Sequence, residues 1–513
     1  MGRRFIPVFS GAILLTLSLT ANAGPGDNRG AVLRGLASQI GRALGAASAC
    51  PNVARPRIDR IAAKFNSVIK ASSANQDEFN AVVEQLNKAE SEGARAVAGK
   101  QTDCSTAERQ LADLENASAP APQSGAVQPA VFPAQEAAAA VRGVSSDEIR
   151  FGASVPLTGP NRDYGQQIRT GIETAFLIAN DAGGVNGRML RLITIDDGYE
   201  PTRTAETVKQ LYEKDQVFGF IGNFGTATAA VSVPFALERH MLFYAGYSGA
   251  NILRRDPPDH YVFNYRPSYA EETDAAVHYL VKLRRIKPEQ IAVFAQQDGF
   301  GDAGFQGVEK AMRALRGSNG GSILHLTYQR NSVDVDAAVS QLKSHKTPIK
   351  AVVMAATYRA AARFIEKTRD VYPGLIYTNP SVVEPDSLRD ELVLLGPKYA
   401  AGVIVTQAVP DVGGYSSLVL EYKSALAKYF GGEAPSATSL EYYVAARVLI
   451  EALKHAGPQL DTEKLVDAFE AMHGLDLGLG TPISFGKSEH QGLHKVWGTQ
   501  LNESGKYEPI DLQ

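Results

Sequence analysis

Short loops that combine glycine with a hydroxyl or an aromatic side chain recur in the second half of the chain. They span 156–165, 222–226, 245–249 and 297–301, and each follows a stretch typical of a β-strand. Glycine lets the backbone approach a ligand closely, and free N–H groups with a hydroxyl at a helix start favour an anion. We therefore expect an anion-binding site with aromatic side chains that cover an apolar body.

Ordinary turn chemistry explains any one of these loops equally well. In that interpretation Thr226 and Ser248 only cap helices, because a side-chain oxygen at a helix start accepts a backbone N–H bond. Loops of the same composition that all follow strands favour one shared ligand site over several unrelated turns.

Motifs for catalysis or metal binding are incomplete. The run 246–250 approaches the nucleophile elbow G-x-S-x-G, but Ala250 stands where the last glycine is required. The glycines of 301–307 match neither a dinucleotide fingerprint nor a phosphate loop. His490 and His494 lie four residues apart without the HExxH context of a zinc site. We therefore expect no enzyme, no catalytic residue, no metal and no cofactor.

Asp196 and Asp197 end a strand-like stretch, and two adjacent acids resemble a pair of catalytic carboxylates. Solvated acids at strand ends are commoner than catalytic pairs, so we interpret both residues as solvated. A hydrolase or dehydrogenase on an α/β scaffold is accordingly the weakest of the functions considered.

Strand-like and helix-like stretches alternate from about residue 148 onward, and these elements must position the loops. Amphipathic helical stretches such as 164–182 and 201–215 separate most of the strands. Strands are expected at 149–155, 190–195, 217–221, 241–245, 290–295, 323–328, 350–355, 375–378 and 402–405. The alternation predicts parallel sheets covered by helices, and this many strands fits two α/β lobes better than one sheet. Ligands in such sheets bind where the strands end.

Length and composition indicate a soluble protein of several domains. The chain has 513 residues, of which 44% are hydrophobic and 21% charged. The formal net charge of −3 gives no electrostatic reason to expect nucleic acid or an anionic membrane as a partner.

The N-terminus has the features of a secretory signal peptide. Arg3 and Arg4 precede an apolar stretch that ends near Leu19, and small residues at 21 and 23 form a cleavage site. We expect residues 1–23 to be removed after Ala23 and the chain to be periplasmic, without stable membrane insertion. A retained anchor is less favoured because the apolar stretch is short.

Residues 24–116 have apolar side chains at helical spacing and are expected to form a helical hairpin or coiled-coil segment. Cys50 and Cys104 are the two cysteines of the chain, and an even pair in an exported protein predicts a disulfide. Residues 117–147 are rich in Ala, Pro, Gln and Ser and indicate a linker.

From residue 148 to about 505 the chain resembles the type I periplasmic binding proteins of the leucine/isoleucine/valine-binding family, which serve ABC importers. The shared signatures are 156–159 with Tyr164 and Gly165, 180–188, Asp196 and Asp197 with Pro201, 215–222, 262–266, and Phe300 and Gly301, and Phe485 and Gly492 fit the last hairpin. The resemblance implies an α/β fold of two parallel-sheet lobes with three hinge crossings. Lobe one is then expected at 148–267 plus 405–475, and lobe two at 268–404 plus 476–513. Such lobes close on the ligand by hinge motion.

The resemblance also implies the positions of the ligand-binding residues. Lobe one is expected to hold a ligand carboxylate, and lobe two an aromatic group and the ligand ammonium. The candidate residues are Tyr164, Asn223, Phe224, Thr226, Gly246, Tyr247, Ser248, Phe300, Tyr358, Ser381 and Glu384.

One candidate departs from the family pattern. Ser381 stands where the family has the acid that binds an ammonium, and a buried ammonium without a charge partner is costly. Glu384 lies three residues further on. We therefore expect a ligand that keeps an acid group, either an amino acid or an aromatic or aliphatic carboxylate.

The resulting function is that of a solute-binding receptor that captures a small polar, carboxylate-bearing molecule and delivers it to an ABC permease in the inner membrane. The alternative is a ligand-sensing protein that docks on a signalling or scaffold partner through the N-terminal helices.

Overall fold

The computed structural model describes residues 29–55, parts of 57–69, 76–99, 102–116, 141–316 and 322–512. The predicted signal peptide and most of the predicted linker lie outside the described residues. The chain divides into two compact units, Met1–Gln135 and Glu136–Gln513. None of the helices in the described ranges combines the length and apolar character needed to cross a membrane.

The N-terminal unit is built on helices α1 (Arg29–Ser48), α3 (Gln76–Ala98) and α4 (Cys104–Asn116). Ile40, Leu44, Val82 and Leu86 are buried between α1 and α3. Glycine permits this close packing, since a Cβ on Gly45 would lie 1.8 Å from the Glu90 carbonyl oxygen. The expected packing of two long helices is present. Helix α4 is a further helix, which the apolar pattern of residues 24–116 did not distinguish from the helix before it.

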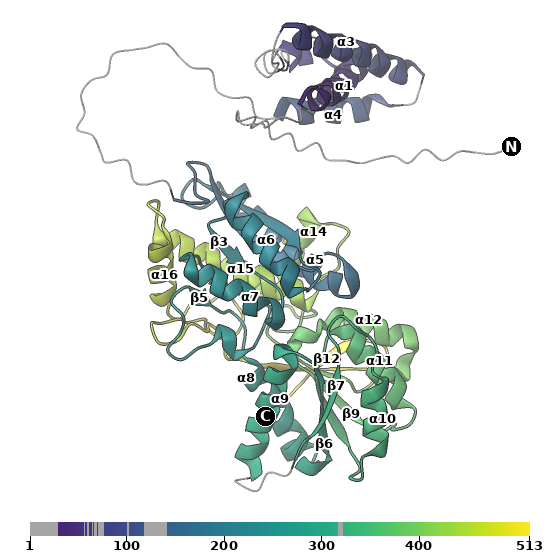
Figure 1. Cartoon of the computed structure of the whole chain (residues 1–513), viewed down its shortest axis with the longest axis vertical. Helices are drawn as coiled ribbons and strands as arrows, with labels where there is room; N and C mark the ends of the chain where they lie inside the picture. Colours follow the sequence, from purple (N-terminus) through teal and green to yellow (C-terminus); the bar gives the residue numbers. More distant parts are fainter. Residues whose placement is uncertain are drawn as a thin grey trace, which may run out of the picture. The chain divides into compact units, whose positions relative to one another are not determined.

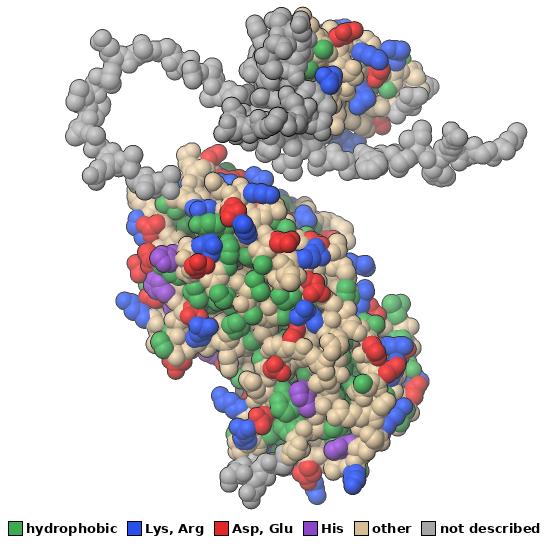
Figure 2. All heavy atoms as spheres, viewed as in Figure 1, with side chains coloured by type: hydrophobic (Ala, Val, Ile, Leu, Met, Phe, Trp, Pro, Cys, Tyr) green, Lys and Arg blue, Asp and Glu red, His purple; other side chains and the backbone are tan. Residues whose placement is uncertain are grey.

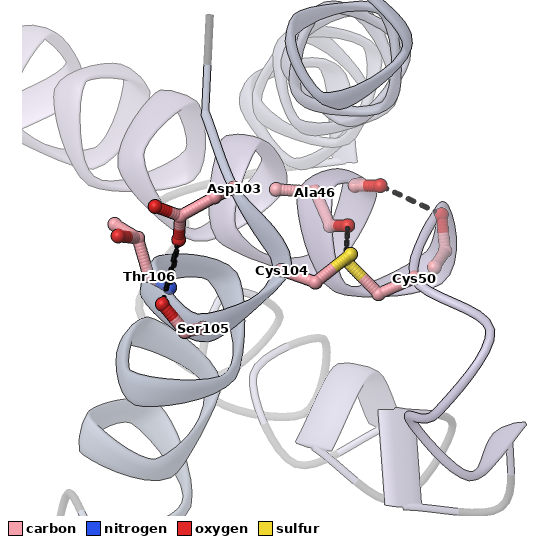
Figure 3. The surroundings of a disulfide bond; sticks show 8 residues. Ala46, Cys50, Asp103, Cys104, Ser105 and Thr106 are labelled. Atoms are coloured by element: carbon pink, nitrogen blue, oxygen red, sulfur yellow. Dashed lines mark hydrogen bonds between the residues drawn. A yellow bond between two sulfur atoms is a disulfide. The ribbon is translucent and has the colours of Figure 1, made fainter. Parts of the chain in front are cut away.

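The predicted disulfide between Cys50 and Cys104 is confirmed (Figure 3). It joins the residue just after α1 to the first residue of α4, with 5.6 Å between the Cα atoms. Asp103 caps α4, because its carboxylate accepts bonds from Thr106 N at 2.7 Å and Ser105 Oγ at 2.8 Å. The bond therefore fixes α4 against the end of α1.

Lobe one of the second unit contains a five-stranded parallel sheet in the order β2-β1-β3-β4-β5. Its strands are β1 (Glu148–Val155), β2 (Met189–Asp196), β3 (Gly219–Ile221), β4 (Phe243–Tyr244) and β5 (Val262–Phe263). Its helices are α5 (Arg162–Asp181), α6 (Pro201–Glu213), α7 (Thr226–Glu238), α14 (Ser417–Tyr429), α15 (Ala437–Ala456) and α16 (Thr462–Glu470). A Cβ on Gly171 of α5 would meet the Ser439 carbonyl oxygen of α15 at 2.2 Å, so these two helices are in close contact.

Lobe two contains a seven-stranded sheet in the order β12-β11-β10-β9-β8-β6-β7, in which β10 with β11 and β11 with β12 pair antiparallel and the other pairs are parallel. The strands are β6 (Ile291–Gln296), β7 (Leu324–Tyr328), β8 (Ala351–Ala355), β9 (Ile376–Asn379), β10 (Ile404–Gln407), β11 (Trp497–Leu501) and β12 (Tyr507–Ile510). The helices are α8 (Tyr269–His278), α9 (Gly299–Arg316), α10 (Asp336–Ser344), α11 (Tyr358–Arg369), α12 (Pro385–Leu395) and α13 (Pro397–Ala400). Figure 1 shows α8 and α9 on one side of this sheet and α10 to α12 on the other. The predicted α/β fold of two sheets is confirmed.

Three crossings of the chain connect the lobes. The first follows β5, and Asn264 within it exchanges backbone hydrogen bonds with the third crossing, at His490 and Gly492. The second crossing follows β10, and the Tyr265 hydroxyl donates to Ala408 O within it at 3.1 Å. Because β10 pairs in lobe two, residues 405–407 belong to that sheet, a few residues beyond the boundary expected at 405.

Candidate functional site

The loops that follow β3 and β4 lie side by side and form the lobe-one wall of the cleft. Gly225 N donates to Tyr247 O at 3.3 Å, and Tyr247 N donates to Asn223 O at 2.8 Å. These bonds bring the hydroxyls of Thr226 and Ser248 to 2.7 Å from each other. The sequence-predicted residues from 223–226 and 246–248 are therefore in one place.

Helix capping does not account for Thr226. It is the first residue of α7, and the N-cap is Gly225, which has no side chain to cap with. Gly225 has a φ of 93°, and a Cβ there would meet the Tyr199 ring at 2.3 Å, so glycine is required. The Thr226 and Ser248 hydroxyls and the N-terminus of α7 thus form a set of neutral hydrogen-bonding groups that suits an anion.

Aromatic side chains from both lobes pack together beside these hydroxyls. The Tyr164 ring centroid lies 4.6 Å from Phe224, 5.7 Å from Tyr247 and 5.6 Å from Tyr358. Tyr358 belongs to lobe two and the other three to lobe one. We call these four residues the aromatic cluster. All four are buried, so the lobes are closed over them.

Tyrosine hydroxyls hydrogen-bond across the cleft. Tyr164 Oη donates to Val383 O of lobe two at 2.9 Å. In the opposite direction, Tyr358 Oη donates to Asp163 Oδ2 at 2.6 Å and lies 2.9 Å from Pro160 O. The aromatic cluster is therefore part of the contact that holds the two lobes together.

Phe300 lies at the start of α9 and packs against Tyr269, which in turn contacts the lobe-one hydroxyls. Its ring centroid is 5.3 Å from Tyr269, the first residue of α8. Burial raises the pKa of Tyr269, and the Arg266 charge and hydrogen bonds with Thr226 and Ser248 oppose this rise. Tyr269 therefore brings lobe two into contact with the lobe-one hydroxyls, and no motif pointed to this role.

Ser381 is engaged by protein groups of the hinge. Its N–H donates to Glu272 Oε2 at 2.7 Å, its hydroxyl accepts a bond from Arg266 Nη2, and its carbonyl accepts one from Tyr247 Oη. Arg266 Nε lies 3.3 Å from Glu441 Oε1, and both side chains are buried. We call Arg266, Glu272, Ser381 and Glu441 the hinge network.

Burial has a clear electrostatic effect in the hinge network. It raises the pKa of Glu441 to about 7, although the Arg266 charge counteracts the rise. Although burial opposes the change, the charges of Glu441 and Glu272 together raise the pKa of the Arg266 guanidinium. The residues Arg266, Glu272 and Glu441 were missed as functional positions, although Arg266 closes a motif, 262–266, that the resemblance contains.

Glu384 lies at the lobe-two edge of the aromatic cluster. It is the N-cap of α12, and its Oε2 accepts a bond from Ser387 N at 2.6 Å. Desolvation by burial, and next the charge of Asp386, raise its pKa. Burial raises the pKa of Tyr164, Tyr247 and Tyr358, and the charge of Glu384 adds to each rise, so this carboxyl lies near the cluster.

The acids that end β2 are structural. Asp197 is fully buried and accepts bonds from Ser154 Oγ at 2.7 Å and Thr204 Oγ1 at 3.0 Å. Asp196 Oδ1 accepts the Leu157 N–H at 2.8 Å and thereby fixes the loop after β1. Our interpretation of both residues as solvated is wrong for Asp197, because neighbouring hydroxyls supply the partners that water would otherwise provide.

The comparisons with known proteins agree with this geometry. A family model described as "Periplasmic binding protein" matches residues 148–506. A crystal structure from Rhodopirellula baltica SH 1, of a "possible leucine/isoleucine/valine-binding protein", is 34% identical, covers 73% of this chain and 98% of its own, and superposes with a TM-score of 0.68. An "Amino acid binding protein" of Pseudomonas aeruginosa is 24% identical over 63% of this chain and 83% of its own.

A structure from Thermus thermophilus described as a branched chain amino acid ABC transporter with bound valine shares the fold. It is 20% identical, covers 72% of this chain and 96% of its own, and has a TM-score of 0.63. The family match covers most of the chain and leaves the N-terminal helices outside it. The chain therefore belongs to the periplasmic binding proteins of the leucine/isoleucine/valine-binding type, a family of binding proteins rather than enzymes.

Proposed function

We propose that this chain is the receptor of an ABC importer and that it captures a small amphipathic carboxylate between its lobes. The observation that carries the proposal is the pairing of Thr226 and Ser248 at the N-terminus of α7, directly beside the buried aromatic cluster. Hydroxyl and backbone donors suit the acid group of the ligand, and the rings suit its apolar body. The relatives described as amino acid-binding and as valine-bound support a ligand of this kind.

A calorimetric titration with matched probes tests the ligand class. L-leucine, L-phenylalanine and 3-phenylpropanoate would each be compared with the corresponding alcohol or primary amide, which keeps the apolar body and lacks the acid group. We expect at least one carboxylate to bind, and its neutral counterpart to bind at least about tenfold more weakly. Equal binding of acid and neutral probes, or no binding of any acid, would contradict the proposal.

The permease partner is part of the same proposal, since the leucine/isoleucine/valine-binding type that this chain resembles serves ABC importers. Lys/Arg and Asp/Glu side chains are interspersed over the visible face of the two-lobed unit, without a large patch of one sign (Figure 2). This mixed surface suits a partner that recognises the closed shape through many small contacts. Ligand-stimulated ATP hydrolysis by the cognate ABC transporter, reconstituted in vesicles with this protein, is the expected result.

A second candidate function rests on the N-terminal unit. Its described helices contribute no strand to either sheet and are held by their own disulfide. Ligand capture does not need such a unit, so it favours the alternative of a sensor that docks on a signalling or scaffold partner. Affinity capture with residues 24–116 distinguishes the two: recovery of a signalling protein supports sensing, and recovery of the permease supports transport.

A further inference from the structure

Two segments of lobe two carry an excess of positive charge. Segments 282–290 and 343–350 together contain seven lysines and arginines but one acid, Glu289. The whole chain has a formal net charge of −3, so its totals do not reveal this local excess. Charge of one sign that is concentrated on a nearly neutral protein indicates a partner of the opposite sign.

The fold brings the two segments together at one edge of the sheet. The first follows α8 and the short helix η3 (Tyr279–Leu283) and leads into β6, while the second leads from α10 into β8. Strands β6 and β8 are parallel neighbours, so the residues that precede them lie at the same edge. Lys350 N donates to Gln290 O at 2.8 Å, which places the two segments in direct contact.

Most of these cations are exposed to solvent and have no counter-ion. We call six exposed residues the basic edge: Lys282, Arg285, Lys287, Lys343, Lys346 and Lys350. None of the six forms an ion pair with an acid in the described ranges. Arg284 differs from them, because its Nη1 donates to Tyr279 Oη at 3.2 Å.

Lysines on the helices of lobe one show the opposite behaviour. Lys209 lies 3.9 Å from Glu213, and Lys454 lies 2.8 Å from Glu451. Lys428 pairs with Asp181 in the same way. Exposed lysines of this protein therefore commonly have an acidic neighbour, and the basic edge lacks such neighbours.

Helix ends explain only part of the basic edge. Lys282 and Lys343 lie in the last turns of η3 and α10, where a cation favours the helix dipole. This effect is lost beyond the last turn. Lys287, Lys346 and Lys350 follow the helices, so helix stability does not account for them.

The basic edge is also remote from the cleft. The loops after β6, β8 and β9 form the lobe-two wall, whereas the basic edge precedes β6 and β8. Strand β6 has six residues, so the two ends of the sheet are about 20 Å apart. Figure 1 shows the end of this sheet that lies opposite the cleft pointing away from lobe one. The cations therefore serve a partner other than the ligand in the cleft.

The composition of the basic edge indicates which partner. Five of its six residues are lysines, and lysine is depleted in protein–protein interfaces, where arginine is enriched. Strongly hydrated lysines suit diffuse attraction to an anionic membrane surface. Leu283 lies among them with 48% of its surface exposed, and an apolar side chain beside cations is typical of contact with lipid headgroups.

We propose that the basic edge docks lobe two on a membrane surface that is rich in anionic phospholipid headgroups. The contact is electrostatic and reversible, without insertion into the bilayer. It keeps the receptor close to the membrane that holds its transporter, while the cleft at the opposite end of the sheet stays free to open. This inference goes beyond the proposed function and does not depend on the class of ligand.

Sedimentation with lipid vesicles tests the proposal on the exported chain. Vesicles of equimolar phosphatidylglycerol and phosphatidylcholine provide the anionic surface, and vesicles of phosphatidylcholine alone provide the neutral one. We expect binding to the anionic vesicles only. Binding should fall at least about tenfold when the salt concentration rises from about 0.05 M to about 0.5 M, because salt screens exposed charges.

A quadruple variant removes most of the charge. Lys282→Gln, Lys287→Gln, Lys346→Gln and Lys350→Gln together should weaken binding to anionic vesicles at least about 100-fold, since each lysine near such a surface contributes roughly fivefold. All four side chains are exposed, so the fold should tolerate the changes. The double variant Lys346→Gln with Lys350→Gln should lose about 20-fold and serves if the quadruple variant folds poorly.

The matched control changes four exposed lysines on the helices of lobe one or directly after them. Lys209→Gln, Lys214→Gln, Lys428→Gln and Lys454→Gln together alter the net charge of the chain by the same amount. This control should bind anionic vesicles within about twofold of the wild-type protein, because the position of the charge decides binding. Ligand affinity in calorimetry should be unchanged in both quadruple variants, because neither set of lysines lies in the cleft.

The possible outcomes separate a membrane from other partners. Absence of binding to anionic vesicles, equal binding to neutral vesicles, or equal losses in the two quadruple variants would overturn the proposal. If vesicles alone do not bind but the basic-edge variant lowers stimulation of the reconstituted transporter, the partner is an acidic protein surface and the membrane proposal is wrong. Each of these results leaves the proposed function standing, because ligand capture is measured separately.

Discussion

The two walls of the cleft bury polar groups of different kinds. On lobe one, the loops after β3 and β4 present neutral groups, and the Thr226 and Ser248 hydroxyls bond each other at 2.7 Å. On lobe two, the loop after β9 presents Glu384, a buried acid whose Oε1 has no hydrogen-bond partner within 2.5–3.5 Å in the part of the chain that the structure describes. Neutral groups that satisfy each other are buried at little cost, whereas a buried acid is tolerated only if something compensates for it.

In the proposed function the neutral hydroxyls of lobe one bind the acid group of the ligand. The hinge network lies between the two walls and contains Arg266, whose guanidinium lies 4.5 Å from the Tyr247 ring centroid. The following predictions test this comparison, beginning with the largest effect.

Arg266→Met should cause the largest loss of stability. The change removes the cation that two buried carboxylates, Glu441 and Glu272, share. Breaking a buried charge pair in this way costs about 3–5 kcal/mol, which urea unfolding would measure. The double variant with Glu441→Gln should recover part of the loss. A cost below about 1 kcal/mol would show that the hinge does not depend on this charge.

Glu441→Gln should alter the pH dependence of stability. The pKa of Glu441 is raised to about 7 in the folded protein, above its unfolded value. The folded state therefore binds the proton more tightly, and wild-type stability should fall as pH rises from about 4.5 to about 7, by up to about 3 kcal/mol. The glutamine variant should lack this fall. Parallel stability curves for the two proteins, from urea unfolding across this range, would contradict the assignment.

The double variant Thr226→Val with Ser248→Ala should weaken the binding of the ligand's acid group by lobe one. We expect a loss of about 2 kcal/mol in binding, roughly 30-fold in Kd, for every carboxylate probe. Neutral probes, which lack the acid group, should lose little affinity, because their binding does not use these hydroxyls. Equal losses for acid and neutral probes, measured by calorimetry, would mean that the two hydroxyls do not serve the acid group.

Tyr358→Phe should have the smallest effect. The variant keeps the ring in the aromatic cluster and removes the hydroxyl that bonds Asp163 across the cleft at 2.6 Å. One such bond contributes about 1 kcal/mol, so ligand dissociation should become about fivefold faster in stopped-flow experiments. Tyr415→Phe, at a side chain that is 85% exposed, is the matched control and should leave the rate unchanged.

The fold was predictable because the pattern of alternating strands and helices is strong along the chain. The pattern missed β5, which has two residues, and β11 and β12, which pair antiparallel at the sheet edge. Short strands leave little periodicity to read, since two residues do not define an alternation. The disulfide was predictable because the chain has only two cysteines.

The candidate site was predictable in lobe one and less so in lobe two. Loops directly after strands bring Thr226 and Ser248 together, which the order of strands alone implies. The environment of Glu384 depends on a left-handed turn and on residues far along the chain, such as Thr438, and no local pattern contains that information. Tyr269 and Arg266 were missed for the same reason, because their partners lie far from them along the chain: Thr226 and Ser248 for Tyr269, and Ser381 and Glu441 for Arg266.

Hydrogen–deuterium exchange with and without L-leucine tests the central claim most directly, namely that the ligand binds between two walls of different chemistry. The account predicts slower exchange in the lobe-one segments 223–228 and 246–250 and in the lobe-two segment 381–388, with no change in α1 and α3 of the N-terminal unit. Protection confined to one lobe, or located away from both walls, would contradict it.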